Sequence, residues 1–130
     1  MPSSPLEAAF RQALYAAAPG LMQFMCEQFR FAPPRRWRSD FAFPCVKILV
    51  EIDGTGGYSR HRSLIGFSKD CEKTNAATVL GYATLRYDTI SLKGEGLARC
   101  VAEVVALVRE RMDVITDRYD SFAYGAGDDG

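Results

Sequence analysis

The stretch Trp37-Arg-Ser-Asp-Phe-Ala-Phe-Pro-Cys-Val-Lys-Ile-Leu-Val-Glu-Ile-Asp53 decides the fold, because apolar and polar residues alternate on both sides of a proline. Such alternation is typical of half-buried β-strands, and Pro44-Cys45 predicts the turn of a hairpin. Glu51 and Asp53 share one face of the second strand with Lys47. The residues expected to form a core stripe on the opposite face are Val46, Ile48, Val50 and Ile52. One face of the hairpin is therefore polar.

Two acidic side chains of this hairpin are expected on one face. A tight turn at Pro44-Cys45 places Asp40 opposite Leu49 and diagonal to Glu51, with backbones about 7–8 Å apart. Carboxylates at that spacing can hold one cation between them. Hard oxygen ligands in small number favour Mg²⁺ or Mn²⁺, which keep several water ligands and accept phosphate oxygens. The hairpin thus predicts a divalent-cation site.

Two helices are expected before the hairpin. Apolar residues at helical spacing predict the first from Leu6 to about Ala18, where Pro19-Gly20 ends it. A second, short helix is expected from about Leu21 to Phe29, buried on much of its circumference. Pro33-Pro34 then forbids helix and starts the extended segment that leads into the hairpin.

A crossover connection is expected after the hairpin. The segment from Gly54 to Gly66 carries four glycines and predicts a binding loop or lid. Ser68 is expected to cap a helix that runs to about Leu80, and Tyr82–Tyr87 to form a strand. This order of strand, helix and strand predicts a parallel outer pair with a right-handed crossover.

The last large element is a helix expected from about Glu95 to Met112. Residues from about 120 to 130 are rich in Gly and Asp and are expected to form a disordered tail. With 48% hydrophobic residues, the chain can bury a core without disulfides. No repeat or internal boundary appears, so residues 1–130 are expected to form a single domain of α/β (α+β) class.

Composition narrows the functional classes. The 16 basic residues balance the 16 acidic ones, which argues against nucleic-acid binding by bulk charge alone. The apolar runs are too short to span a bilayer and no export signal precedes them, so we expect a cytoplasmic protein without a membrane partner. The four cysteines match no zinc or redox spacing, and we expect small buried thiols in a reducing compartment.

Several cationic side chains are expected where they can meet phosphate groups. They are Arg35, Arg36 and Arg38 around the start of the first strand, Arg60 and Arg62 in the glycine-rich segment, and Lys69 on the helix after it. Lys69 and Lys73 are four residues apart and extend the stripe expected to face the sheet, so one ammonium can point toward the carboxylates. A lysine there can orient or deprotonate an attacking water, or stabilise charge on the phosphoryl group.

Four segments carry a resemblance to a known family. They are Asp40 on one strand, Glu51-Ile-Asp53-Gly54 on the next, Asp70-Cys-Glu-Lys73-Thr-Asn75 on a helix, and Gly81-Tyr-Ala-Thr-Leu-Arg-Tyr87 on a strand. This order resembles the PD-(D/E)xK nuclease superfamily, and within it small, often phage-encoded proteins related to the very-short-patch-repair endonuclease. The resemblance covers about residues 36 to 90. It implies a restriction-endonuclease-like αβββαβ core, with a mixed central sheet flanked by helices, and DNA as the substrate.

The same resemblance implies that Asp40 and Glu51 are metal-binding carboxylates. The chain departs from the superfamily pattern where a lysine is expected two residues after the glutamate, because Asp53 stands there. Two alternatives follow. Either the lysine role has moved to Lys73 or Lys69, of which we favour Lys73, or Asp53 is a third metal ligand and His61 serves as acid or base.

These expectations combine into a metal-dependent DNA endonuclease, a hydrolase of phosphodiester bonds in a bacterial or phage-infected cell. Its cofactor would be Mg²⁺ or Mn²⁺, and Lys73 or His61 would assist proton transfer. A chain this small has little surface for reading bases, so a homodimer or a partner protein would supply specificity. The alternative is a nuclease fold without turnover that binds DNA or protein. A structural or assembly protein is a third, weaker interpretation.

Overall fold

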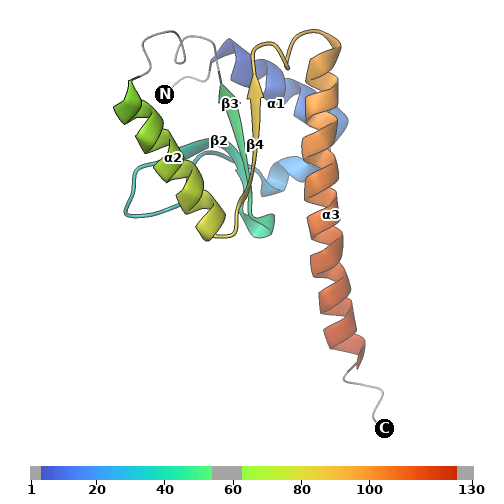
Figure 1. Ribbon diagram of the computed structural model, residues 1–130. Helices are drawn as coiled ribbons and strands as arrows, with labels where there is room; N and C mark the ends of the chain where they lie inside the picture. The colour runs from blue at the N-terminus through green and yellow to red at the C-terminus, as the bar shows by residue number, and fades with distance from the viewer. Residues whose placement is uncertain (1–3, 54–62, 126–130) are drawn as a thin grey trace.

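The computed structural model describes residues 4–53 and 63–125, with side chains described as far as residue 120. Figure 1 shows a sheet that lies between α2 on one side and α1 with α3 on the other. In chain order the elements are α1 (Pro5–Ala17), η1 (Pro19–Phe24), β1 (Cys26–Arg30), β2 (Arg38–Phe43), η2 (Pro44–Val46), β3 (Ile48–Asp53), α2 (Leu64–Val79), β4 (Ala83–Asp88) and α3 (Glu95–Gly125). η1 and η2 are 3₁₀-helices.

The sheet is mixed and has the strand order β1-β2-β3-β4. β1 pairs with β2 and β2 with β3 in antiparallel fashion, whereas β3 and β4 are parallel. A parallel pair needs a crossover, and α2 supplies it. The predicted mixed α/β (α+β) class and the parallel outer pair are confirmed.

Two layers of apolar side chains cover the two faces of the sheet. The larger layer lies under α1 and α3, where Phe10 stacks on Phe41 with ring centroids 5.5 Å apart. The four residues predicted as a core stripe, Val46, Ile48, Val50 and Ile52, belong to this layer. The smaller layer lies under α2 and includes Ala42, Leu49 and Ala77. The sheet is therefore buried on both faces near its centre.

The segment expected to be a second helix forms other structure. Residues Pro19–Phe24 make a short 3₁₀-helix, and Cys26–Arg30 is the edge strand β1. Gln28 has a positive φ of 50°, which interrupts the pairing of β1 with β2 between Glu27 and Phe29. Pairing with β2 satisfies the backbone here, so tertiary context overrides the helical spacing of the apolar residues.

The downstream helices also differ from expectation at their ends. α2 begins at Leu64 and is capped by Ser63, whose Oγ accepts a hydrogen bond from the Gly66 N–H at 3.0 Å, so Ser68 is not the cap. Gly81, with a φ of 89°, follows the end of this helix as predicted. α3 continues past Met112 to Gly125, so residues 120–125, which were expected to belong to a disordered tail, are helical.

Some sequence expectations concern residues beyond those described. Most of the glycine-rich segment, residues 54–62, and residues 126–130 of the expected tail lie outside the described ranges. Of the four free cysteines, Cys100 is buried as predicted, Cys71 is half-buried, and Cys26 and Cys45 are exposed. Cys26 lies on the edge strand and Cys45 in the turn, which leaves both at the surface. Within residues 4–53 and 63–125, no helix is both long and apolar enough to cross a membrane.

Candidate functional site

Asp40 lies where β2 and β3 separate. The register pairs Leu49 with Ala42, so the expected pairing of Leu49 with Asp40 is wrong. The connection is longer than a tight turn, because η2 is followed by Lys47 in a left-handed conformation with a φ of 58°. Beyond the Phe41–Val50 pair, Oδ2 of Asp40 accepts a hydrogen bond from the Ile52 N–H at 2.8 Å. A side chain thus replaces a strand bond and holds Asp40 level with the carboxyl end of β3.

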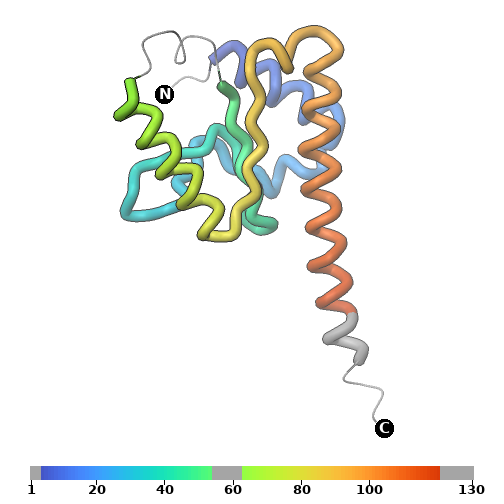
Figure 2. Tube along the Cα trace, in the orientation of Figure 1, coloured from blue at the N-terminus to red at the C-terminus, as the bar shows by residue number. Residues whose placement is uncertain are grey.

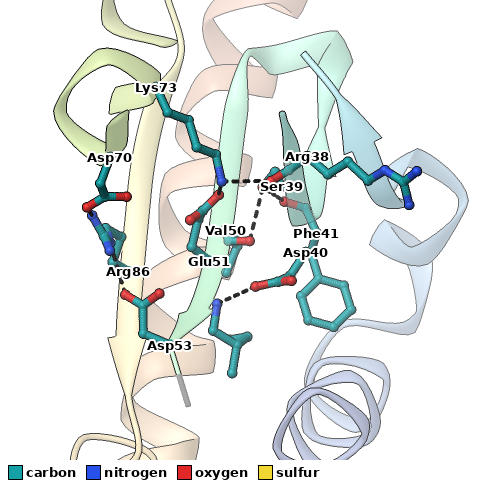
Figure 3. A network of polar contacts seen from close by, with 11 residues as sticks. Arg38, Ser39, Asp40, Phe41, Val50, Glu51, Asp53, Asp70, Lys73 and Arg86 are labelled. Carbon is teal, nitrogen blue, oxygen red and sulfur yellow. Dashed lines mark hydrogen bonds and ion pairs between the residues drawn. The ribbon is translucent and has the colours of Figure 1, made fainter. Parts of the chain in front are cut away.

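Ser39 stabilises this separation from inside the sheet. Its side chain is fully buried, and its Oγ lies 2.7 Å from the carbonyl oxygen of Phe41 and 3.1 Å from that of Val50. Figure 3 shows Ser39 between the two strands, with its hydroxyl directed toward the Val50 carbonyl. The backbone around Asp40 is therefore fixed by side-chain bonds on both sides.

Glu51 on β3 meets Lys73 on α2. The Lys73 Nζ donates to Oε1 of Glu51 at 2.8 Å and to the carbonyl oxygen of Arg38 at 2.9 Å. Both side chains are largely enclosed, with exposed fractions of 23% for Lys73 and 13% for Glu51. Burial raises the pKa of Glu51 above its usual range, and Asp40 adds to the rise, although Lys73 opposes it. Of the two lysines considered from the sequence, Lys73 contacts the carboxylate.

Asp53 belongs to a second ion-pair network on the same side of the sheet. Its Oδ2 accepts from Nε of Arg86 at 3.0 Å, and another nitrogen of Arg86 lies 3.4 Å from Oδ2 of Asp70. Arg86 is the cross-strand partner of Glu51 in the parallel pair. Arg86 was not among the residues predicted from the sequence, although the alternation of β4, with Tyr87 buried in the core, could have placed it on the polar face.

Glu7 is a second residue that was not predicted from the sequence. Burial and the neighbouring Asp40 carboxylate raise the pKa of Glu7, and the two carboxyl groups are within hydrogen-bond reach, while Arg11 partly offsets the repulsion. Glu7 lies in the first turn of α1, where its N–H donates to Ser4 Oγ at 3.1 Å. The sequence contains no local signal for this contact, because it depends on how α1 packs against β2.

The described members of the predicted phosphate-binding set lie on α2, on β2 and on the segment before β2. Arg35 stacks on Trp37 with its guanidinium carbon 4.5 Å from the ring centroid, and it forms an ion pair with Glu72 of α2. Arg36, Arg38 and Lys69 are exposed. The remaining predicted residues, Arg60, His61 and Arg62, lie outside the described ranges. Trp37 is half-buried and stacks on Phe31.

The donor set has the chemistry of a hard-cation site. Carboxylates outnumber cations here, with Glu7, Asp40, Glu51, Asp53 and Asp70 set against Lys73 and Arg86. Carboxylate oxygens are the ligands that Mg²⁺ prefers, and this ion commonly takes one or two of them with waters and substrate oxygens. Among the described residues, no group of three or more His, Cys, Asp or Glu could hold a metal ion. A metal site among these described residues would therefore have fewer than three protein ligands of these types.

Comparisons with protein-family models, with curated proteins and with solved structures find no match for this chain. Its function must be argued from the site itself.

Proposed function

We propose that this protein is a metal-dependent DNA endonuclease that hydrolyses phosphodiester bonds with Asp40, Glu51 and Lys73 at its active site. The observation that carries the proposal is the contact of Lys73 with Glu51 beside the Asp40 carboxylate. An ammonium held against an enclosed carboxylate, next to a second carboxylate, is a typical arrangement for metal-assisted hydrolysis of a phosphate ester.

The arrangement of helices and strands also favours membership of the PD-(D/E)xK nuclease superfamily. α1, three antiparallel strands, the crossover helix α2 and the parallel strand β4 follow the αβββαβ order of the restriction-endonuclease-like core. Asp40 and Glu51 lie on the second and third of these strands, and Lys73 replaces from α2 the lysine missing at position 53. The fold family is thus part of the proposal.

Asp40 and Glu51 would hold the Mg²⁺ or Mn²⁺. When bound, the ion would supply positive charge that polarises the phosphodiester and activates water. Burial is the main cause of the raised pKa of Glu51, but the Asp40 charge adds to it, and Glu7 lies against Asp40. A divalent cation would relieve this repulsion among the carboxylates, which favours the role. Asp53 would serve as a further ligand only by exchanging its Arg86 partner for the ion.

The Lys73 ammonium would lie where it can stabilise negative charge near the reacting phosphate. Its ammonium is fixed by Glu51 and by the Arg38 carbonyl, so it is oriented before substrate binds. It would orient the attacking water or donate to a phosphoryl oxygen that gains negative charge. Arg35, Arg36, Arg38 and Lys69, with Arg60 and Arg62, would contact flanking phosphates and position the duplex without reading its sequence.

The decisive experiment is a cleavage assay on supercoiled plasmid. The wild-type protein should nick or linearise the plasmid with Mg²⁺ or Mn²⁺ and be inactive with EDTA. Asp40→Asn and Glu51→Gln keep the shape of each side chain and should abolish cleavage, whereas Arg118→Gln, on the exposed distal part of α3, should retain it. Cleavage that persists in both carboxylate variants would exclude this active site.

A second candidate is a DNA- or protein-binding module with the same fold and no turnover. Two observations favour it: the described residues offer no metal site of three ligands, and Asp53 stands where the superfamily has its lysine. Such a module would retain DNA at low salt with equal affinity in wild type and in Asp40→Asn, and would cut none of linear, single-stranded, mismatched or four-way-junction DNA. Specificity in either case would come from a homodimer, a partner protein or DNA structure.

A further inference from the structure

The crossover helix α2 covers the polar face of the sheet with little apolar packing. All of its sixteen residues are described, and of these Ala77, near the C-terminal end, is the one that is buried. The apolar side chains of its first turn point away from the sheet, since Leu64 is 87% exposed and Ile65 71% exposed. Apolar burial therefore holds the C-terminal end of α2 to the sheet and contributes little at its N-terminal half.

Ion pairs link the middle of α2 to the rest of the domain. Residues 70–73 provide three of them: Asp70 with Arg86, Glu72 with Arg35, and Lys73 with Glu51. Figure 3 shows two of these links side by side, with Asp70 and Lys73 both reaching from α2 toward the strands. Residues three apart lie on one face of a helix, so the positions of these two side chains depend on each other.

Arg86 joins three elements at one point. It lies on β4 directly across from Glu51, it donates to Asp53 at the end of β3, and it reaches Asp70 on α2. The planar guanidinium has a fork of donors that can serve two carboxylates at once, which a lysine ammonium does less rigidly. Asp53 therefore aims Arg86 toward the helix, and Arg86 sets how closely α2 approaches the sheet.

We propose that Arg86 is a positioning residue of the active site: by holding Asp70, it fixes the N-terminal half of α2 and so places the Lys73 ammonium against Glu51. The catalytic consequence rests on the proposed function. The positioning itself can be measured on the folded protein without any substrate, so the two can fail separately. This role also gives Asp53 a partner at the position where the superfamily has a lysine.

Hydrogen exchange followed by mass spectrometry tests the positioning. In Arg86→Gln, the amides of residues 64–73 should exchange about tenfold faster than in wild type, as expected when charged hydrogen bonds that restrain a segment are lost. Asp70→Asn removes only the helix side of the contact and should show the same change even if Arg86→Gln perturbs the sheet. The double variant should exchange little faster than either single variant, and the amides of α3 should exchange at the wild-type rate. Unchanged exchange in Asp70→Asn would overturn the proposal.

The matched control is Arg118→Gln, which removes the same charge from the exposed distal part of α3. It should leave exchange of residues 64–73 at the wild-type rate. Acetylation of Lys73 gives a second readout, because its Nζ is held by two oxygens in the wild type. Its labelling rate should rise several-fold in Asp70→Asn relative to the control. An equal rise in Arg118→Gln would show a general loss of stability instead and would contradict the proposal.

Kinetics separate positioning from substrate binding. If the wild type cleaves DNA, Asp70→Asn and Arg86→Gln should lower kcat while KM for DNA stays within about twofold, because an interaction made only in the transition state is lost. Arg86→Lys keeps the positive charge but lacks the forked donors of the guanidinium, so its kcat should lie between those of Arg86→Gln and the wild type. A raised KM with unchanged kcat would identify Arg86 as a phosphate contact and refute positioning. Absence of cleavage by the wild type would contradict the nuclease proposal. The hydrogen-exchange rates of residues 64–73 would still decide whether Arg86 is a positioning residue.

Discussion

The ammonium of Lys73 lies 2.8 Å from Oε1 of Glu51, although the two residues are 22 positions apart and come from a helix and a strand. Because α2 crosses over from β3 to β4, it passes above the polar face of β3 and brings its lysine to the glutamate. The crossover helix thus brings a lysine to a carboxylate from a part of the chain that is distant in sequence.

Replacing Lys73 should therefore damage catalysis more than replacing its exposed neighbour. Lys73→Met is expected to reduce the rate of plasmid cleavage by about a hundredfold, the typical contribution of a positioned acid–base or electrostatic group. Lys69→Met removes the same charge from a side chain at the surface and should weaken DNA binding without a loss of that size in kcat. Equal kcat losses in both variants would argue against a special role for Lys73.

Glu51→Gln should stabilise or spare the fold while it abolishes cleavage. The pKa of Glu51 is raised in the folded state, mainly by burial, so the charged carboxylate costs folding free energy at neutral pH. For a raised carboxyl pKa, this cost is absent below the ordinary pKa of glutamate and appears as the pH rises through the folded value. Urea unfolding of the variant should therefore give a free energy equal to or above that of the wild type at pH 7, with the difference shrinking toward pH 4. A variant clearly less stable at pH 7 would contradict this sign.

Much of the hairpin could be predicted because its information is local. The alternation around Pro44 is enough to assign β2 and β3, and the buried Val50 and Ile52 follow from the parity of the second strand. The selection of Lys73 also follows from local rules, because helical spacing places it on the stripe that faces the sheet. In these elements the same side chains would face the core in almost any tertiary setting.

The parts that could not be predicted depend on contacts distant in sequence. β1 is an exposed edge strand whose structure comes from pairing with β2, and its apolar spacing is helical. The register of the hairpin depends on Lys47, which has a left-handed backbone conformation. The sequence does not signal this conformation, because it is typical of glycine and asparagine and not of lysine. Glu7 and Arg86 join the site only through the packing of α1 on β2 and of β4 beside β3.

Glu7→Gln should weaken the affinity for the metal ion without removing activity. The Glu7 carboxyl group lies beside Asp40 and raises the negative charge that a cation would meet there. Titration of cleavage with Mg²⁺ should show half-maximal activity at a several-fold higher concentration in the variant, with a maximal rate close to that of the wild type. Glu110→Gln, which alters an exposed acid on α3, is the control and should leave the midpoint unchanged.

Tyr87→Phe should lower stability without changing the active site. The Tyr87 hydroxyl donates to Oε1 of Glu103 at 2.7 Å and ties β4 to α3. Burial and this acceptor raise the pKa of Tyr87, so the hydroxyl keeps its proton throughout the neutral range. Loss of the bond is expected to cost about 1–2 kcal/mol in the free energy of urea unfolding. A cleavage rate reduced tenfold under conditions where the variant is fully folded would contradict the assignment of Tyr87 to the structural side of the sheet.

Arg36→Gln should weaken DNA binding in a way that salt reveals. Arg36 is exposed next to the strand that carries Asp40, where a phosphate on either side of the reacting one would lie. Each phosphate contact contributes about 0.9 to the slope of log affinity against log salt concentration on B-form DNA. DNA binding can be measured by fluorescence anisotropy between about 50 and 200 mM salt, an interval over which electrostatic binding weakens strongly. The slope of log affinity against log salt concentration should fall by about one unit in the variant. Arg118→Gln removes an equal charge from α3, whose C-terminal part extends beyond the sheet (Figure 2), and should keep the wild-type slope. If both variants lower the slope equally, binding reflects overall charge, and the DNA does not lie along the end of β2 that holds Asp40.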